Sequence, residues 1–172
     1  MFSVQDEYKT LVDIAGRTAG GSHGSLLGQD DAVYVVVHAN KVLAHHELPG
    51  VSIEATELPD GIEAHISVAD GTVLPKPVHL CFGHLGSEGR QTIQSKIHIG
   101  KGARAVFLAH CIFPNALEFL HAMEGEIVVD EGGDFSYNEV HVHGPDGKIT
   151  VRPVSRVVLE RGAIYRGDFT LV

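Results

Sequence analysis

Apolar and polar residues alternate in short segments along most of the chain, and this alternation predicts β-strands. From residue 32 onward, runs rich in Val and Ile are separated every several residues by Gly, Pro, Asn or Asp, as in strands joined by turns. The chain is therefore predicted to be mainly β. The runs are AVYVVV (32–37), GIEAHISV (61–68), QTIQSKIHI (91–99), ARAVFLAH (103–110), GEIVVD (125–130), KITVRPV (148–154) and SRVVLE (155–160).

Helical spacing of apolar residues occurs in only two segments. Residues 5–15 have the pattern of a short amphipathic helix, and residues 115–124 (NALEFLHAME) could form a second helical turn. Residues 16–28 are rich in Gly and Ser and have no periodicity, which is typical of a connector. We therefore expect an N-terminal helix with its connector over residues 1–28 and a β domain over residues 29–172.

A sequence repeat runs through the β region. The segments ISVADGT (66–72), IHIGKGA (97–103), IVVDEGG (127–133) and VVLERGA (157–163) share one pattern of β-branched, apolar, polar and glycine positions. They begin at residues 66, 97, 127 and 157, so the spacings are 31, 30 and 30 residues. A constant period of this length is typical of stacked coils, in which glycine forms the corner of each coil. A β-helix-like solenoid is favoured over an antiparallel sandwich or barrel, because a sandwich would not need the same corner in every unit.

Composition narrows the classes of function. The chain has 172 residues, 44% of them hydrophobic, and a formal charge of −9, which argues against nucleic acid or an anionic membrane as a partner. Its longest apolar runs, such as Val33 to Val37, are too short to cross a bilayer. The first residues lack the pattern of a secretory signal, and two cysteines do not form a disulfide framework. We expect a cytoplasmic protein with reduced thiols.

The chain has 12 histidines, and the repeat places some of them at equivalent positions of successive units. His79 and His110 each lie thirteen residues after the start of a unit, and Cys81, Cys111 and His141 follow one or two positions beyond the same point. In a parallel solenoid, equivalent positions on successive coils lie about 4.8 Å apart, so these side chains are expected to gather in one line. The candidate ligands are Cys111, His110 and Cys81 for a cofactor, and His141, His143, Glu139, His79 and His121 for a metal.

Thiolate and imidazole are ligands of zinc, iron and iron–sulfur clusters. A simpler interpretation is that the cysteines are small core residues and the histidines stack without metal. No CxxC or HExxH spacing favours the metal interpretation. A cupin-like metal-binding β-barrel is the alternative, with His141, His143 and Glu139 as ligands. In that motif an acid follows the histidines, whereas here Glu139 precedes them.

Three longer stretches resemble the SufB/SufD family of iron–sulfur cluster assembly proteins, and in particular its short, minimal archaeal-type SufB-like members. The stretches are PVHLCFGHLGSEGRQTI (77–93), AVFLAHCIFPNALEFLHAMEGEI (105–127) and FSYNEVHVHGPDGKITVRP (135–153). The resemblance implies a right-handed parallel β-helix and a cytoplasmic scaffold subunit of the SUF system. It also implies a SufC-like ABC ATPase, or a SufB/SufD-like chain, as partner.

The family's C-terminal region, with a Cys-containing strand and an HEA motif, has no counterpart in these residues, so its cysteine role is not carried over to Cys111 or Cys81. We expect a scaffold rather than an enzyme, in which Cys111 and neighbouring imidazoles bind iron or a nascent iron–sulfur cluster. The open last coil of a solenoid exposes strand edges and apolar side chains, which predicts a homodimer.

Overall fold

The computed structural model describes residues 3–18 and 31–172. One helix precedes a β domain that holds eleven strands within the described residues. The elements are α1 (Val4–Thr18), β1 (Tyr34–His38), β2 (Lys41–His46), β3 (Val51–Leu58), β4 (Gly61–Val68), β5 (Val78–Gly83), β6 (Glu88–Ile99), β7 (Arg104–Phe113), β8 (Glu118–Val129), β9 (Asp134–His143), β10 (Lys148–Leu159) and β11 (Ile164–Leu171).

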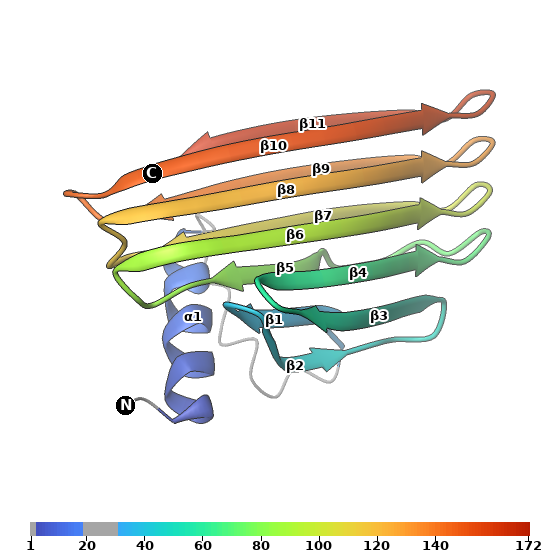
Figure 1. The fold of residues 1–172 in the computed structure, drawn as a ribbon. Coiled ribbons are helices and arrows are strands. Elements are labelled where there is room, and N and C mark those ends of the chain that lie inside the picture. Colours follow the sequence, from blue (N-terminus) through green and yellow to red (C-terminus); the bar gives the residue numbers. More distant parts are fainter. Residues whose placement is uncertain (1–2, 19–30) are drawn as a thin grey trace.

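The strands form two sheets that face each other across a common core (Figure 1). Sheet A has the order β11-β9-β7-β5-β1-β2, and sheet B has the order β10-β8-β6-β4-β3. Strands of successive coils pair in parallel, and only the first hairpins, β1–β2 and β3–β4, are antiparallel. Each coil therefore contributes one strand to each sheet. The predicted parallel β-solenoid is confirmed, and a cupin-like barrel has no support.

The pairing in sheet B follows the sequence repeat. Ile66 pairs with Ile97, and Ile97 pairs in turn with Ile127 on the next coil. Ile127 pairs with Val157, so the four units lie directly above one another. The sixth residue of each unit is a glycine that lies in the turn to sheet A with a positive φ, a conformation that strongly favours glycine. These φ values are 67°, 63°, 70° and 71° for Gly71, Gly102, Gly132 and Gly162.

The first coil departs from the repeat in sheet A. His79 pairs with Leu108 rather than with His110, and Cys81 pairs with His110. The expected alignment of His79 with His110 is therefore wrong by two residues. The first coil takes two more residues to pass from β4 to β5, in a corner that contains Pro75 and Pro77. A shift of two residues keeps each side chain on its original face of the sheet.

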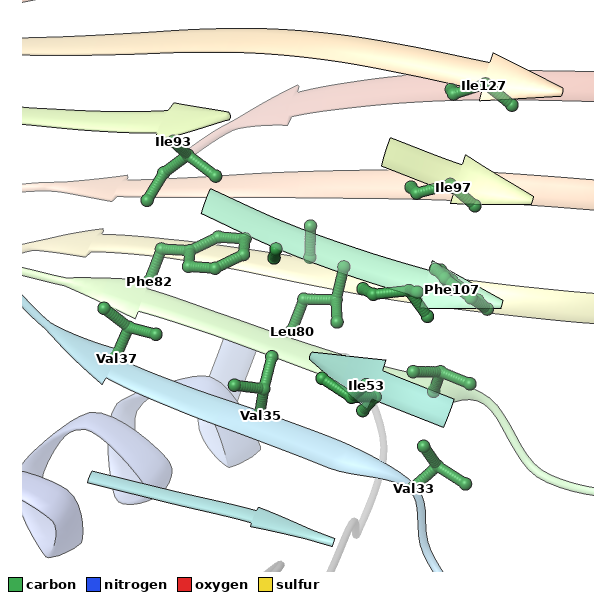
Figure 2. Packing of buried hydrophobic residues seen from close by; sticks show 14 of the residues in the cluster. Val33, Val35, Val37, Ile53, Leu80, Phe82, Ile93, Ile97, Phe107 and Ile127 are labelled. Carbon is green, nitrogen blue, oxygen red and sulfur yellow. The ribbon is translucent and has the colours of Figure 1, made fainter. Parts of the chain in front are cut away.

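The core lies between the two sheets and consists mainly of Val, Ile, Phe and Ala side chains (Figure 2). These residues alternate along each strand with side chains that point outward, as a half-buried strand requires. Phe107 and Phe135, on neighbouring strands of sheet A, contact each other edge to face at 4.9 Å between ring centroids. Both are fully buried, so the interior of the solenoid is packed rather than open at this level.

Helix α1 crosses the outer face of sheet A beside β1, β5 and β7 (Figure 1). Its first turn is capped by Ser3 and Asp6: the Asp6 amide donates to Ser3 Oγ at 3.2 Å, and the Ser3 amide donates to Asp6 Oδ2 at 3.1 Å. Such reciprocal capping satisfies amides that have no partner inside the helix. The apolar face of α1 packs on Val36, Cys81 and Ile112 of the sheet.

Several predicted boundaries need correction. Residues 115–124 are not helical: from Glu118 they belong to β8, because pairing with β6 and β10 on both sides outweighs helical propensity. Residues 148–154 and 155–160 form one strand, β10, instead of two. Helix α1 extends to Thr18, and the rest of the expected connector, residues 19–28, lies outside the described residues. Within the described residues, no helix is long and apolar enough to cross a membrane.

Candidate metal centre in the solenoid lumen

The two faces of sheet A divide the predicted ligands into two groups. His110 and Cys111 are neighbours on β7, so their side chains point to opposite faces. Cys111 belongs to the core between the sheets, whereas Cys81 packs beneath α1 on the outside. The lumen group contains Cys111, Glu139, His141, His143 and His121, and the helix-covered group contains His79, Cys81 and His110. The expected single line of ligands is therefore two separate groups.

Three side chains of the lumen group converge. Ligand atoms of Cys111, His121 and His141 all lie within 4.8 Å of one another, and the three residues are buried. Cys111 and His141 are paired residues of β7 and β9, and His121 reaches them from β8 in the opposite sheet. Among the described residues, this is the one group of three or more Cys, His, Asp or Glu side chains close enough to share a metal ion. A donor set of one sulfur and two nitrogens suits zinc or iron.

A buried carboxylate orients His141. The side chains of Glu139 and His141 lie on the same face of β9, and His141 Nε2 forms a short hydrogen bond with Glu139 Oε1. A carboxylate accepts hydrogen bonds, so this contact favours a proton on Nε2 and leaves Nδ1 with its lone pair. Nδ1 of His141 is buried and has no hydrogen-bond partner among the described residues. In metal sites a carboxylate commonly binds the ring nitrogen of histidine that does not bind the metal, and so fixes the orientation of the ring.

His121 is the least satisfied polar side chain in the lumen. It is fully buried, and neither of its ring nitrogens has a hydrogen-bond partner among the described residues. Burial, together with His141 and His143, lowers the pKa of His121 to about 3. The ring is therefore neutral, and a neutral imidazole is the form that binds metal. A buried polar group without a partner costs stability, which a bound ion would recover.

The cysteine of this group is a protonated thiol when nothing is bound. Burial, aided by the charge of Glu139, raises the pKa of Cys111 well above its usual value. Burial also raises the pKa of Cys81 to about 12. Neither thiol is a reactive nucleophile in this state, since reactivity requires the thiolate. A metal would have to displace the Cys111 proton, which is the usual way in which metal binding is linked to pH.

Aromatic rings contact two of the three candidate ligands, His121 and His141. Phe113 lies 4.8 Å from His121, and Phe169 lies 4.7 Å from His141, measured between ring centroids. His143 lies two residues beyond His141 on the same face, 5.8 Å from its ring. Burial and His141 lower the pKa of His143. His143 thus borders the group without being one of the three ligands that converge.

The helix-covered group has a different arrangement. The rings of His79 and His110 stack at 5.9 Å with an interplanar angle of 7°. Cys81 pairs with His110 on the neighbouring strand β7. On its own strand, β5, it follows His79 by two residues. Cys81 packs in a cluster to which Tyr8, Leu11, Val12 and Ala15 of α1 contribute. The group therefore has the surroundings of a packed helix–sheet interface, and it remains only a predicted site.

Sequence reasoning found all three converging residues but could not group them. The sequence predicts His121 as a metal ligand, but it does not indicate that His121 lies opposite Cys111 and His141. Its alternation with Phe119 and Met123, which also point inward, is the signal that would have assigned it to the lumen face of a strand.

Comparison with known proteins shows which proteins this chain is similar to. The chain is 38% identical over 167 residues to an iron–sulfur cluster assembly SufBD family protein of Pyrococcus horikoshii, covering 96% of this chain and 49% of the relative. It is 33% identical over 169 residues to a second such protein of Methanocaldococcus jannaschii, covering 98% of this chain and 53% of the relative. The chain thus spans about half the length of the curated relatives it matches. No family model matches it.

Proposed function

We propose that this chain is a SufBD family protein that acts in iron–sulfur cluster assembly, because two proteins of that family are 38% and 33% identical to it over nearly its whole length. In this proposal the solenoid is a scaffold, and Cys111, His121 and His141 bind iron or a nascent cluster as cargo. The observation that carries the proposal is the convergence of these three buried side chains within 4.8 Å in the lumen. Four buried imidazole nitrogens of His121, His141 and His143 that have no hydrogen-bond partner among the described residues support it.

The chemistry of this group suits ligation rather than turnover. Two imidazoles and a thiol supply three donors, which leaves other positions on an iron ion for sulfide or for a receiving protein. A bound cation would stabilise the Cys111 thiolate, and Glu139 would orient His141 through their hydrogen bond. Since the thiol must lose its proton, we expect the affinity for metal to rise with pH.

The partners and location belong to the same proposal. We propose a cytoplasmic protein that works with a SufC-like ABC ATPase or a SufB/SufD-like chain. A homodimer is supported by apolar side chains on the outer face of the last coil, among them Val158 and Ile164, which are 41% and 44% exposed. Exposed apolar side chains of this kind favour contact with another chain. A monomeric mass at micromolar concentration would contradict the homodimer.

Anaerobic reconstitution tests the proposal with a matched pair of cysteine variants. Wild type, Cys111→Ser and Cys81→Ser are incubated with ferrous iron and sulfide, and sulfur-to-iron charge-transfer absorbance is recorded. Both cysteines are fully buried, so both substitutions place a hydroxyl in an apolar site. We expect the absorbance in wild type and Cys81→Ser, and its loss in Cys111→Ser.

Two results would contradict the proposal. Wild type without charge-transfer absorbance would exclude cluster or iron ligation by a thiolate. Equal loss in both variants would mean that the absorbance depends on general packing of sheet A and not on the lumen group. Urea unfolding of each variant separates this second case from a loss of folding.

A further inference from the structure

Gln91 is a fully buried polar side chain on the lumen face of β6. It alternates in step with Ile93 and Ile97 of the same strand, which belong to the core between the sheets. Glutamine is seldom fully buried, because its amide then needs hydrogen-bond partners inside the protein. An apolar side chain could fill this position without that requirement, so the buried amide of Gln91 indicates a specific role.

The amide group of Gln91 is held in one orientation. Its Nε2 donates to the backbone oxygen of Ala39 at 2.7 Å and to that of Gly83 at 3.3 Å. Both of these partners are carbonyl oxygens, which only accept, so the nitrogen of the amide and not its oxygen must face them. The Ala39 carbonyl is itself fixed, because the Ala39 amide donates to the same Gly83 oxygen at 2.8 Å. The side-chain oxygen Oε1 of Gln91 therefore does not face the two carbonyls.

This oxygen stands beside His121. Gln91 and His121 are paired residues in the parallel register of β6 and β8, and both side chains lie on the lumen face. Paired residues of neighbouring strands lie about 4.8 Å apart, so an imidazole at one position is within reach of an amide at the other. Gln91 Oε1 and both ring nitrogens of His121 are buried and have no hydrogen-bond partner among the described residues. An acceptor without a donor is thus the neighbour of an imidazole without an acceptor.

We propose that Gln91 is the positioning residue of His121: when a metal ion binds one ring nitrogen of His121, the other nitrogen donates a hydrogen bond to Gln91 Oε1. The inference rests on the proposed function and adds the residue that orients its ligand from sheet B. A neutral imidazole has one lone pair and one N–H, so ligation through the lone pair leaves the N–H on the other nitrogen. Glu139 has the corresponding place behind His141 in sheet A. Since Gln91 and His121 are not hydrogen-bonded to each other in the structure, the ring of His121 must turn when the ion binds.

Two substitutions of Gln91 separate the oxygen of its amide from the nitrogen. Gln91→Met keeps an unbranched side chain and removes both groups. Gln91→Glu also removes the NH₂ group that bonds to Ala39 and Gly83, but it keeps an acceptor oxygen beside His121. Gln94→Met is the control, because Gln94 lies on the same strand with its side chain exposed on the outer face. Co²⁺ affinity is measured by equilibrium titration against a competing chelator, and folding is checked by urea unfolding.

We expect Gln91→Met to bind Co²⁺ about 10–100-fold more weakly than wild type, which is the usual effect of losing a residue that orients a metal ligand. Gln91→Glu should recover most of the wild-type affinity, and Gln94→Met should not change it. A role in packing alone would weaken binding equally in Gln91→Met and Gln91→Glu, because both lose the bonds to Ala39 and Gly83. Equal weakening in these two variants would therefore overturn the inference.

A crystal structure of the wild-type protein with Co²⁺ bound tests the same contact without any variant. We expect Gln91 Oε1 at about 2.7–3.2 Å from the His121 nitrogen that does not bind the ion. If wild type binds no Co²⁺, the proposed function fails and the inference fails with it. If wild type binds Co²⁺ without this contact, or Gln91→Met binds it as tightly, the inference is overturned while the candidate metal centre stands. The bound wild-type structure decides the question if Gln91→Met does not fold.

Discussion

The two faces of sheet A carry similar residues but have different surroundings. Each face has a buried cysteine and buried histidines, and each has a carboxylate–histidine pair: Glu139 with His141 in the lumen, and Glu7 with His38 beneath α1. The lumen face looks onto a second sheet, from which β8 adds His121. The outer face is covered by α1, which packs Tyr8, Leu11, Val12 and Ala15 with Cys81 and places Glu7 beside His38. Convergence of ligands thus depends on the opposing layer, and not on the strand that carries the cysteine.

The largest expected effect is a loss of stability at the helix-covered face of sheet A, without a change at the lumen face. Leu11 is fully buried in the helix–sheet interface and packs directly against Gly83. Leu11→Ala should lower the free energy of unfolding by about 2–5 kcal/mol, because it leaves a cavity under α1. Labelling of the Cys81 thiol should become faster, whereas labelling of Cys111 should not. Urea unfolding and mass spectrometry of labelled peptides measure both effects.

Val4→Ala is the control for this prediction, since Val4 lies on the same helix and is 61% exposed. Equal labelling of Cys81 and Cys111 in Leu11→Ala would show that the two faces open together, which would contradict their independence.

The second prediction compares two buried histidines. His121→Ala should weaken Co²⁺ binding by at least about 100-fold, since loss of residues behind the ligands alone commonly costs 10–100-fold. His110→Ala should leave the affinity unchanged, because His110 points to the helix-covered face. Equilibrium titration in the presence of a competing chelator gives both affinities. Equal weakening in the two variants would contradict the division of sheet A into a ligating face and a packing face.

The third prediction concerns acid stability. His121 is neutral in the folded protein down to a pKa of about 3, whereas in the unfolded chain it takes up a proton near its ordinary pKa of about 6.5. Its contribution is therefore fully present above pH 6.5 and is lost as the pH falls toward 3. Between pH 6.5 and 4.5 this loss amounts to about 2–3 kcal/mol.

His121→Leu tests this contribution, because it removes the titrating ring and keeps an apolar side chain. The difference in unfolding free energy between the variant and wild type should change by that amount across the same pH window. A difference that stays constant from pH 6.5 to 4.5 would mean that His121 is protonated or solvated in the folded protein.

The period of the fold could be read from the sequence, whereas the register of one sheet could not. The units that start at 66, 97, 127 and 157 predicted the stacking in sheet B because glycine corners mark each coil. In sheet A the first coil contains two extra residues in a corner with Pro75 and Pro77. The pattern of apolar and polar residues does not reveal how many residues such a corner holds, so the pairing of β5 with β7 could not be predicted. A loop that is longer by two residues costs little free energy, so a repeat tolerates the insertion without any change in the sequence of its strands.

The candidate site could be predicted as a set of residues but not as a geometry. Alternation along a strand separates His110 from Cys111, and that part was available from the sequence. His121 approaches Cys111 only because it lies opposite Cys111 in the facing sheet. Which residues face each other across the lumen depends on the number of residues in each turn between the sheets, and the strand pattern does not give that number. The helix over Cys81 is likewise a tertiary contact, because nothing in residues 5–15 specifies the face on which they dock.

The smallest expected effect compares the two carboxylate–histidine pairs. His38 Nδ1 lies 3.2 Å from Glu7 Oε2, with side chains 17% and 23% exposed, and its Nε2 accepts a hydrogen bond from the Leu85 amide. A partly exposed pair of this kind contributes about 0.5 kcal/mol, so Glu7→Gln should speed the labelling of Cys81 only about twofold. Glu139→Gln should leave that labelling unchanged, because its pair faces the lumen. Labelling time courses on both variants measure the difference. Faster labelling of Cys81 in Glu139→Gln would mean that the lumen supports the helix-covered face, and the two faces would then be one coupled unit.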